Sequence, residues 1–299
     1  MKVKGLIYCL IVVMVFFTGF SISCVGLART SIQGEAIDEK KAKLYIVGIG
    51  PGAVDLITIR AIDYIKKADV VICGDATAKK LGGYLEGKEI LSLPRFPYWE
   101  CLERKCSEPS HKDKKRCKEL VHKRKERAAL IRRYIKDGKT VALLEGGDPC
   151  IFGSLRWIKQ EFADDEFEVV PGISSFNVAN ALLKREVVDA YVADRQTRSV
   201  ILTTPARQGD RRDSIENLAK HRSTMVFFMP REFEEKILPE LRKYYPSDTP
   251  VAIVYKAGYP DEKQVVRGTL GSFPVQAPEQ KWLRLIYVGE FLKDASQSN

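Results

Sequence analysis

Short apolar runs alternate with segments of helical spacing along most of this chain, and this alternation limits the folds open to it. Strands that are apolar along their whole length are typical of a parallel sheet covered by helices on both faces. Such runs occupy residues 44–47, 70–73, 89–93, 141–144 and 167–170. A second set occupies residues 200–203, 225–229, 251–255, 265–270 and 283–288. The sequence therefore predicts an α/β fold.

The length of the chain favours two compact domains. A chain of 299 residues with 45% hydrophobic residues can bury a sizeable core. The two sets of apolar runs meet near the segment VVPGISS, residues 169–175. We expect an N-terminal α/β domain over residues 43–172 and a C-terminal α/β domain over residues 173–293.

The first 42 residues stand apart from this pattern. Residues 5–27 are apolar and uncharged and follow Lys2 and Lys4, so residues 1–28 are expected to be a signal peptide or a membrane anchor. The polar residues 29–42 are interpreted as a tether. The protein is therefore expected to be membrane-associated through residues 5–27 or exported. Its side of the membrane stays open, because the lysines before the apolar run favour an outside domain whereas the basic tether weakens that inference.

Positive charge is concentrated in one segment. The net charge of the chain is +10, and residues 95–136 hold 15 Lys and Arg against 6 Asp and Glu, a net charge of +9. Such a segment fits a polyanionic partner, namely nucleic acid, anionic lipid or a polycarboxylate substrate. A solvated lysine-rich helix explains the charge equally well. The segment follows the third predicted strand, so we expect it near the carboxyl edge of the sheet.

The basic segment also contains a cluster of thiols and imidazoles. Cys101, Cys106 and Cys117 follow the spacing C-x4-C-x10-C, with His111 and His122 nearby. This spacing matches no strong metal signature, so we expect no metal site. In an oxidising compartment, two of the three cysteines would form a disulfide.

A glycine-rich turn follows the first predicted strand. Gly48, Gly50 and Ala53 formally satisfy the dinucleotide pattern G-x-G-x-x-G/A, and Thr58 is a candidate N-cap for the next helix. Pro51 stiffens the turn, and Asp75 lies too far along the chain to be the acidic residue of that pattern. The turn therefore predicts a backbone-lined ligand site of another kind.

Two further turns have the same position relative to a strand. These are VALLEGGDPCIFGS, residues 141–154, and EVVPGISSFNVANALL, residues 168–183. Each one alone could be ordinary turn chemistry. Loops at the carboxyl ends of strands in one open sheet converge on a single crevice, so together the three predict a binding site.

The three turns, in this order, resemble the motifs of the tetrapyrrole methylases, which use S-adenosylmethionine. The matching patterns are G-x-G-P-G-x-x-D-L-x-T, G-G-D-P-x-x-F-G and V-V-P-G-x-S-S. The segment TPVAIVYKAGYPDEKQVVRGTL, residues 249–270, is similar to the precorrin-4 methyltransferases of cobalamin biosynthesis. The resemblance covers residues 43–292, but the basic insert at residues 94–127 is longer than the family's connection there.

The resemblance implies two α/β domains with a cofactor cleft between them. It implies a C-methyltransferase that acts on a tetrapyrrole or corrinoid precursor, with S-adenosylmethionine as cofactor. We also expect a homodimer, and no nucleic acid as partner. Asp75 matches an acidic residue that faces the substrate, although it could equally be a helix N-cap. The positions that match cofactor contacts are Pro51, Gly146, Gly147, Asp148, Ile151, Ser174, Ser175, Met229 and Ala257.

The residue types suit methyl transfer, because this reaction mainly requires donor and acceptor to be positioned in line. Two other functions remain open. The apolar leader and the cysteines fit an exported tetrapyrrole-binding protein that has lost methyl transfer. A relative that acts on ribosomal RNA would use the basic insert on phosphates, but the C-terminal resemblance argues against it.

Overall fold

The computed structural model describes residues 43–93, 111–153, 155–188, 198–204, 213–230, 232–273 and 283–293. The predicted leader at residues 1–28 and the tether at residues 29–42 lie outside these ranges. Within them, no helix has the length and apolar character needed to cross a membrane.

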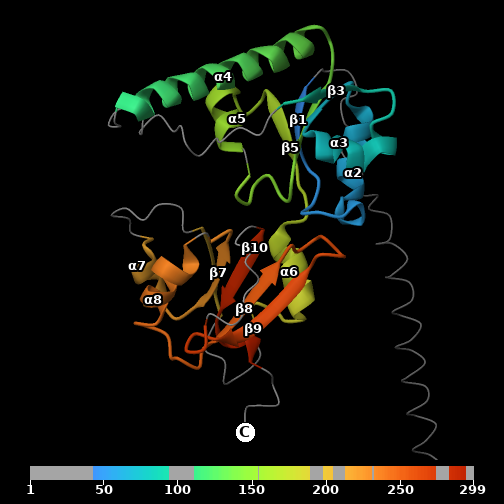
Figure 1. The fold of residues 1–299 in the computed structure, drawn as a ribbon. Coiled ribbons are helices and arrows are strands. Elements are labelled where there is room, and N and C mark those ends of the chain that lie inside the picture. The colour runs from blue at the N-terminus through green and yellow to red at the C-terminus, as the bar shows by residue number, and fades with distance from the viewer. Residues whose placement is uncertain are drawn as a thin grey trace, which may run out of the picture. The chain divides into compact units, whose positions relative to one another are not determined.

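The first sheet contains five parallel strands in the order β3-β2-β4-β1-β5 (Figure 1). Each strand lies within one residue of the run predicted from the sequence. Because β1 is flanked by β4 and β5, the sheet reverses its strand order there, as doubly wound sheets do at their ligand sites. The bounds are β1 Leu44–Gly48, β2 Val70–Cys73, β3 Glu89–Ser92, β4 Val141–Glu145 and β5 Phe167–Val170.

Helices cover both faces of this sheet. Alternate residues of β1 point to opposite faces, so Tyr45 and Val47 pack with α2 (Ile59–Lys67) and α3 (Asp75–Leu81). Leu44 and Ile46 pack on the other face with α4 (His111–Lys136) and α5 (Leu155–Glu161). Two buried faces explain why β1, β2 and most of β4 are apolar, whereas the edge strand β3 is largely exposed.

Helix α2 begins where the sequence predicts. The hydroxyl oxygen of Thr58 accepts a hydrogen bond from the backbone N–H of Ala61 at 3.1 Å. This contact satisfies one of the free N–H groups of the first turn. The predicted N-cap is therefore confirmed.

The second sheet is mixed, with the order β6-β7-β10-β8-β9. Strands β6 and β7 are parallel, whereas β10 is antiparallel to both β7 and β8, and β8 is antiparallel to β9. The bounds are β6 Val200–Thr203, β7 Thr224–Phe228, β8 Pro250–Tyr255, β9 Gln264–Thr269 and β10 Arg284–Val288. With two sheets and their helices, the predicted two-domain α/β fold is confirmed. The boundary between residues 172 and 173 stays a prediction.

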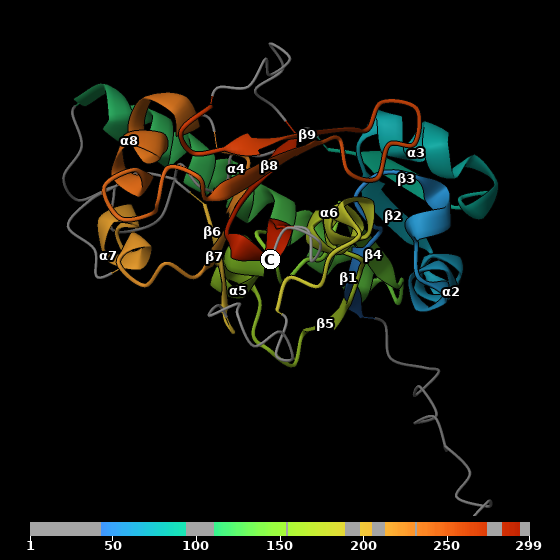
Figure 2. The same ribbon diagram turned by 90° about the horizontal axis from the view of Figure 1, so that it is seen from below.

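Helices cover both faces of the second sheet as well (Figure 2). Met225 and Phe227 of β7 pack with α7 (Ile215–Ala219), the π-helix η5 (Phe233–Ile237) and α8 (Leu238–Leu241). Val226 and Phe228 pack with α6 (Ser175–Leu183). Each half therefore has its own pair of apolar layers.

Helix α4 contains the whole described part of the basic insert, residues 111–127. Arg124 is buried and donates to the carboxylate of Glu161 at 2.5 Å and to Gln160, both at the end of α5. Arg132, about two turns later, donates to the backbone carbonyl of Glu161 at 2.5 Å. Since α5 leads from the carboxyl end of β4 to the amino end of β5, these contacts lie away from the carboxyl edge. The insert was expected near the carboxyl edge of the sheet. Its described part is instead bound to the end of α5, which leads to the amino end of β5.

Cys117 lies in the first half of α4. Its side chain is buried and disulfide-bonded. Cys101 and Cys106 lie outside the described ranges. The pairing of two of the three insert cysteines therefore stays a prediction.

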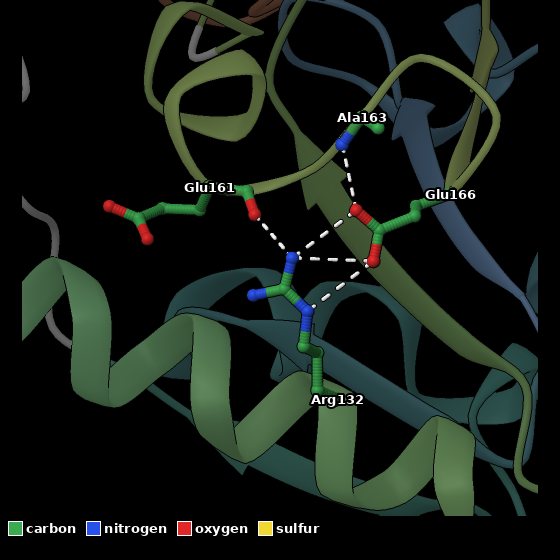
Figure 3. Close-up of polar contacts among 4 residues, drawn as sticks. All are labelled: Arg132, Glu161, Ala163 and Glu166. Atoms are coloured by element: carbon green, nitrogen blue, oxygen red, sulfur yellow. Dashed lines mark hydrogen bonds and ion pairs between the residues drawn. The ribbon is translucent and has the colours of Figure 1, made fainter.

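An ion pair fixes α4 to the loop before β5 (Figure 3). The guanidinium of Arg132 donates to both carboxylate oxygens of Glu166, at 3.2 and 3.3 Å. The backbone N–H of Ala163 donates to the same carboxylate at 2.7 Å. The bond from Ala163 and then that from Arg132 lower the pKa of Glu166. The ionised form is thus favoured by folding.

Replacing Glu166 with Gln should lower the free energy of unfolding at pH 7 by about 0.5 kcal/mol, since exposed pairs are screened by solvent. A carboxyl whose pKa is lowered on folding adds stability above its unfolded-state pKa and loses it as the pH falls. The difference between wild type and Glu166→Gln should therefore vanish near pH 2. Urea unfolding at both pH values measures it, and an equal difference at both would contradict the assignment.

Candidate active site

Three loops meet at the carboxyl ends of β4, β1 and β5, which are neighbours in the first sheet. The backbone N–H of Ile49 donates to the carbonyl of Glu145 at 2.9 Å, and that of Gly147 donates to the carbonyl of Gly50 at 2.7 Å. Gly172, after β5, lies against the other two loops, because a Cβ built on it would be 2.2 Å from the carbonyl oxygen of Gly147. The convergence predicted from the sequence is confirmed.

The loop after β4 is packed on one side and open on the other. A Cβ built on Gly146 or Gly147 would have no atom within 4 Å, whereas one on Gly48 would be 2.6 Å from the backbone nitrogen of Gly172. Gly147 also has a φ of 77°, which favours glycine. The open side leaves room for a ligand to lie directly on this backbone.

Asp148 shapes the turn that follows. One carboxylate oxygen accepts a hydrogen bond from the backbone N–H of Cys150 at 2.7 Å, and its backbone carbonyl accepts one from Ile151 at 3.1 Å. Burial, followed by the charge of Asp148, raises the pKa of the Cys150 thiol. The described bonds of Asp148 therefore hold the turn rather than point to a ligand.

Pro51 lies against the turn that follows β8 in the second sheet. The backbone N–H of Ala53 donates to the carbonyl of Gly258 at 2.6 Å. Gly258 has a φ of 98°, and a Cβ on it would be 2.8 Å from the Cγ of Pro51. Ala257, the preceding residue, is buried. The glycine loop after β1 therefore adjoins the turn that contains Ala257. Pro51 in this loop and Ala257 were both predicted to contact the cofactor.

The loop after β4 reaches the same core of the second half. Ile151 packs against the cluster that contains Ala257, and the ring centroids of Phe152 and Phe228 are 4.6 Å apart. Met229, which follows Phe228, is 51% exposed. The loop after β4 therefore contacts the core of the second sheet through Ile151 and Phe152.

The two predicted serines lie at the start of α6. Ser174 is buried, and its hydroxyl accepts a hydrogen bond from the backbone N–H of Phe176 at 3.2 Å. Asn177 accepts one from the backbone N–H of Ser174 at 3.2 Å, which completes a capping box. Ser175 is the half-buried first residue of the helix. The described contacts of Ser174 serve the helix.

Asp75 is the exposed first residue of α3. The N-cap is Gly74, so the alternative that Asp75 is the capping residue is wrong. A carboxylate in the first turn is still favoured by the helix dipole. Helix α3 reaches the second half, because the Lys80 ammonium lies 6.0 Å from the centre of the Tyr259 ring. This places α3 beside the turn that contains Ala257 and Gly258.

A protein-family model decides the classification. The model described as Tetrapyrrole (Corrin/Porphyrin) Methylases matches residues 43–274, which is more than half of the chain. The chain belongs to the tetrapyrrole methylases. As a tetrapyrrole methylase it is a methyltransferase that uses S-adenosylmethionine.

Several curated tetrapyrrole methylases are similar over most of their length. A cobalt-precorrin-4 C(11)-methyltransferase of Methanocaldococcus jannaschii is 31% identical, and the alignment covers 85% of this chain and 90% of the relative. A precorrin-4 C(11)-methyltransferase of Pseudomonas aeruginosa is 27% identical, with 83% and 90% covered. The predicted resemblance to precorrin-4 methyltransferases is confirmed.

Solved structures give the same result for the fold. The X-ray structure of a cobalt-precorrin-4 methyltransferase of cobalamin biosynthesis superposes with a TM-score of 0.65 at 26% identity, covering 84% of this chain and 96% of that one. A uroporphyrin-III C-methyltransferase from Thermus thermophilus, complexed with S-adenosyl homocysteine, has a TM-score of 0.58 at 20% identity, with 84% and 99% covered.

Several residues of this tetrapyrrole methylase that lie beside the site were missed by the sequence reasoning. Lys256, Gly258 and Leu283 have positive φ angles, and the exposed Phe152 packs against Phe228, the residue before Met229. Gly258 was detectable as a glycine in a turn. For Lys256 and Leu283 no residue type signalled the conformation.

Proposed function

We propose that the chain methylates a carbon of a precorrin-4-like tetrapyrrole, at the C-11 position that the names of its relatives specify. The observation that supports this most is the open backbone at Gly146 and Gly147, beside the turn that contains Ala257. The family alone would fit several tetrapyrrole substrates. The similarity to precorrin-4 methyltransferases favours this one.

The residues around the open backbone fit S-adenosylmethionine, which supplies a methyl group on a positively charged sulfur. Gly146 and Gly147 would hold it by backbone contacts, since no Cβ stands in its place. Ile151, Met229 and Ala257 would give apolar surroundings that exclude water. Such residues mainly position the donor in line with the attacking carbon.

Pro51 and Asp148 would complete the cofactor site, together with Ser174 and Ser175. Pro51 is held against Gly258, so it would form a rigid wall. Asp148 and Ser174 would act chiefly through backbone shape, because their described hydrogen bonds are local. We therefore expect replacement of Gly146 or Gly147 to weaken cofactor binding more than removal of the Ser174 hydroxyl.

Asp75 is the proposed substrate-facing carboxylate. Its exposed position on α3 leaves the carboxylate accessible, and it would orient a pyrrole N–H or accept the proton that leaves the methylated substrate. The electron pair that forms the new carbon–carbon bond comes from the substrate, and that of the broken carbon–sulfur bond stays on sulfur. No further protein group has to form a covalent bond.

The purified full-length chain should bind S-adenosyl homocysteine with a micromolar Kd, which corresponds to about 7–8 kcal/mol. It should also transfer a labelled methyl group to a precorrin-4-like substrate. Calorimetry measures the first and product mass spectrometry the second. Tetrapyrrole binding without methyl transfer would instead support the binding-protein function, and failure to bind S-adenosyl homocysteine would overturn the proposal.

Residues 5–27 are proposed to bring the protein to the membrane or to export it. The uncharged apolar run supports this. The disulfide at Cys117 supports an oxidising compartment, where disulfides persist. A fusion of residues 1–45 to alkaline phosphatase, an enzyme active only outside the cytoplasm, reports the side of the membrane. An active fusion would favour the exported binding protein, whereas an inactive fusion in the membrane fraction would favour the enzyme, which needs the cytoplasmic supply of S-adenosylmethionine. The homodimer is likewise a proposal, which light scattering tests.

A further inference from the structure

Three adjacent strands of the second sheet end at residues whose backbone is left-handed. Met229 follows β7 with a φ of 45°, Lys256 follows β8 with a φ of 45°, and Leu283 precedes β10 with a φ of 53°. Since β10 runs antiparallel to both neighbours, the three residues lie at one edge of the sheet. Residues with large side chains adopt this conformation rarely, and such strain persists only where the surroundings impose it.

The three residues are linked through the start of β10. The backbone N–H of Met229 donates to the carbonyl of Arg284 at 3.1 Å, and that of Lys256 donates to the carbonyl of Leu283 at 2.8 Å. The side chains of Met229 and Leu283 are 51% and 48% exposed, which is unusual for large apolar residues. The strained edge therefore carries two exposed apolar side chains, and one of them, Met229, is a proposed cofactor contact.

The Arg284 side chain holds this edge from beneath. Its guanidinium is 1% exposed and donates to the two carboxylate oxygens of Glu234 at 2.8 and 3.0 Å. It also donates to the backbone carbonyl of Pro230 at 2.8 Å. Glu234 belongs to the π-helix η5, a rare form that is frequent at functional sites. Arg284 therefore makes hydrogen bonds around Met229 at two points. Its backbone carbonyl accepts from the N–H of Met229, and its guanidinium donates to the carbonyl of the next residue, Pro230.

We propose that Arg284 and Glu234 are a positioning pair, which holds Met229 and Leu283 in their left-handed conformations against the bound S-adenosylmethionine. This inference rests on the proposed function, because it takes the edge to be part of the cofactor site. The planar Arg284 guanidinium donates to three acceptor atoms, so these hydrogen bonds fix both the distance and the orientation of the groups they join. An apolar contact would fix only the distance. Neither residue touches the cofactor, and the effect of both passes through Met229 and Leu283.

The test replaces both charges at once, Arg284→Met with Glu234→Leu, because removal of one alone would leave an unpaired buried charge. We expect the Kd for S-adenosyl homocysteine and the KM for S-adenosylmethionine to rise between about 10- and 100-fold, as for other misplaced contacts, with a smaller change in kcat. Hydrogen exchange at the backbone N–H of Met229 should also become faster, and this readout does not depend on the cofactor.

The matched control is the other buried arginine pair, Arg124→Met with Glu161→Leu, which joins α4 to α5. It should lower the thermal midpoint without a change in Kd or in exchange at Met229. If the Arg284→Met, Glu234→Leu variant keeps wild-type Kd and exchange, or if both double variants lose affinity equally, the positioning role is wrong. If the wild type itself fails to bind S-adenosyl homocysteine, the proposed function falls, and faster exchange would then establish only that the pair fixes the edge.

Discussion

Replacing Gly146 with Val should abolish cofactor binding and leave the fold intact. The φ of Gly146 lies outside the left-handed region, and a Cβ on it would have no atom within 4 Å, so the protein itself tolerates a side chain there. In the proposed complex the cofactor occupies that space. We expect the Kd for S-adenosyl homocysteine to rise at least 100-fold, which corresponds to about 3 kcal/mol. Calorimetry measures the loss, and circular dichroism confirms the fold.

Gly83→Val is the matched control for this experiment. Gly83 lies in the short 3-10 helix Gly82–Tyr84, is exposed, and also has no atom within 4 Å of a built Cβ. Gly83→Val should bind the cofactor like wild type. Gly147→Val is less informative, since its φ of 77° strains any other residue. Wild-type affinity in a folded Gly146→Val protein would remove Gly146 from the site.

Replacing Gly172 with Ala should damage both stability and binding. Its Cβ would stand 2.2 Å from the carbonyl oxygen of Gly147 and 2.7 Å from the carbonyl carbon of Gly48, so all three loops must move apart. Overpacking of this kind costs about 1–3 kcal/mol. In a chain of this size that lowers the thermal midpoint by about 2–12 °C. Calorimetric unfolding measures the change.

Gly83→Ala serves as the control for the stability change, because its new methyl group meets no atom. Its thermal midpoint should match that of the wild type. S-adenosyl homocysteine should bind Gly172→Ala more weakly, since the loop that carries Gly147 is displaced. A Gly172→Ala protein with wild-type midpoint and affinity would mean that the loops move apart freely.

The inner strands of the first sheet were predictable because burial on both faces makes them apolar. The runs at residues 44–47 and 167–170 correspond to β1 and β5, the latter without a change of bounds. Strand direction was less accessible. Nothing in the apolar run of β10 distinguishes a strand that lies antiparallel to β7 from one that lies parallel, because its two buried faces look alike in sequence.

Glycines gave the clearest signal of the candidate site in the sequence itself. Gly50 and Gly147, whose hydrogen bond joins the first two loops, have positive φ angles that disfavour any other residue. Leu283 gave no such signal, because it was taken as the first residue of an apolar strand. Its left-handed conformation follows from the tertiary fold around Arg284, which no local pattern encodes.

The position of β1 in the first sheet has a consequence for synthesis of the protein. It is the first strand among the described residues, yet its partners are the last two strands of that sheet, and Val47 pairs with Leu144 and Val170. Ribosomes add about 5–20 residues per second, so roughly 6–25 s pass between β1 and β5. During that interval β1 is an apolar segment with two unpaired edges, the kind of surface that chaperones bind. The strand order therefore sets a minimum time for which these edges stay unpaired.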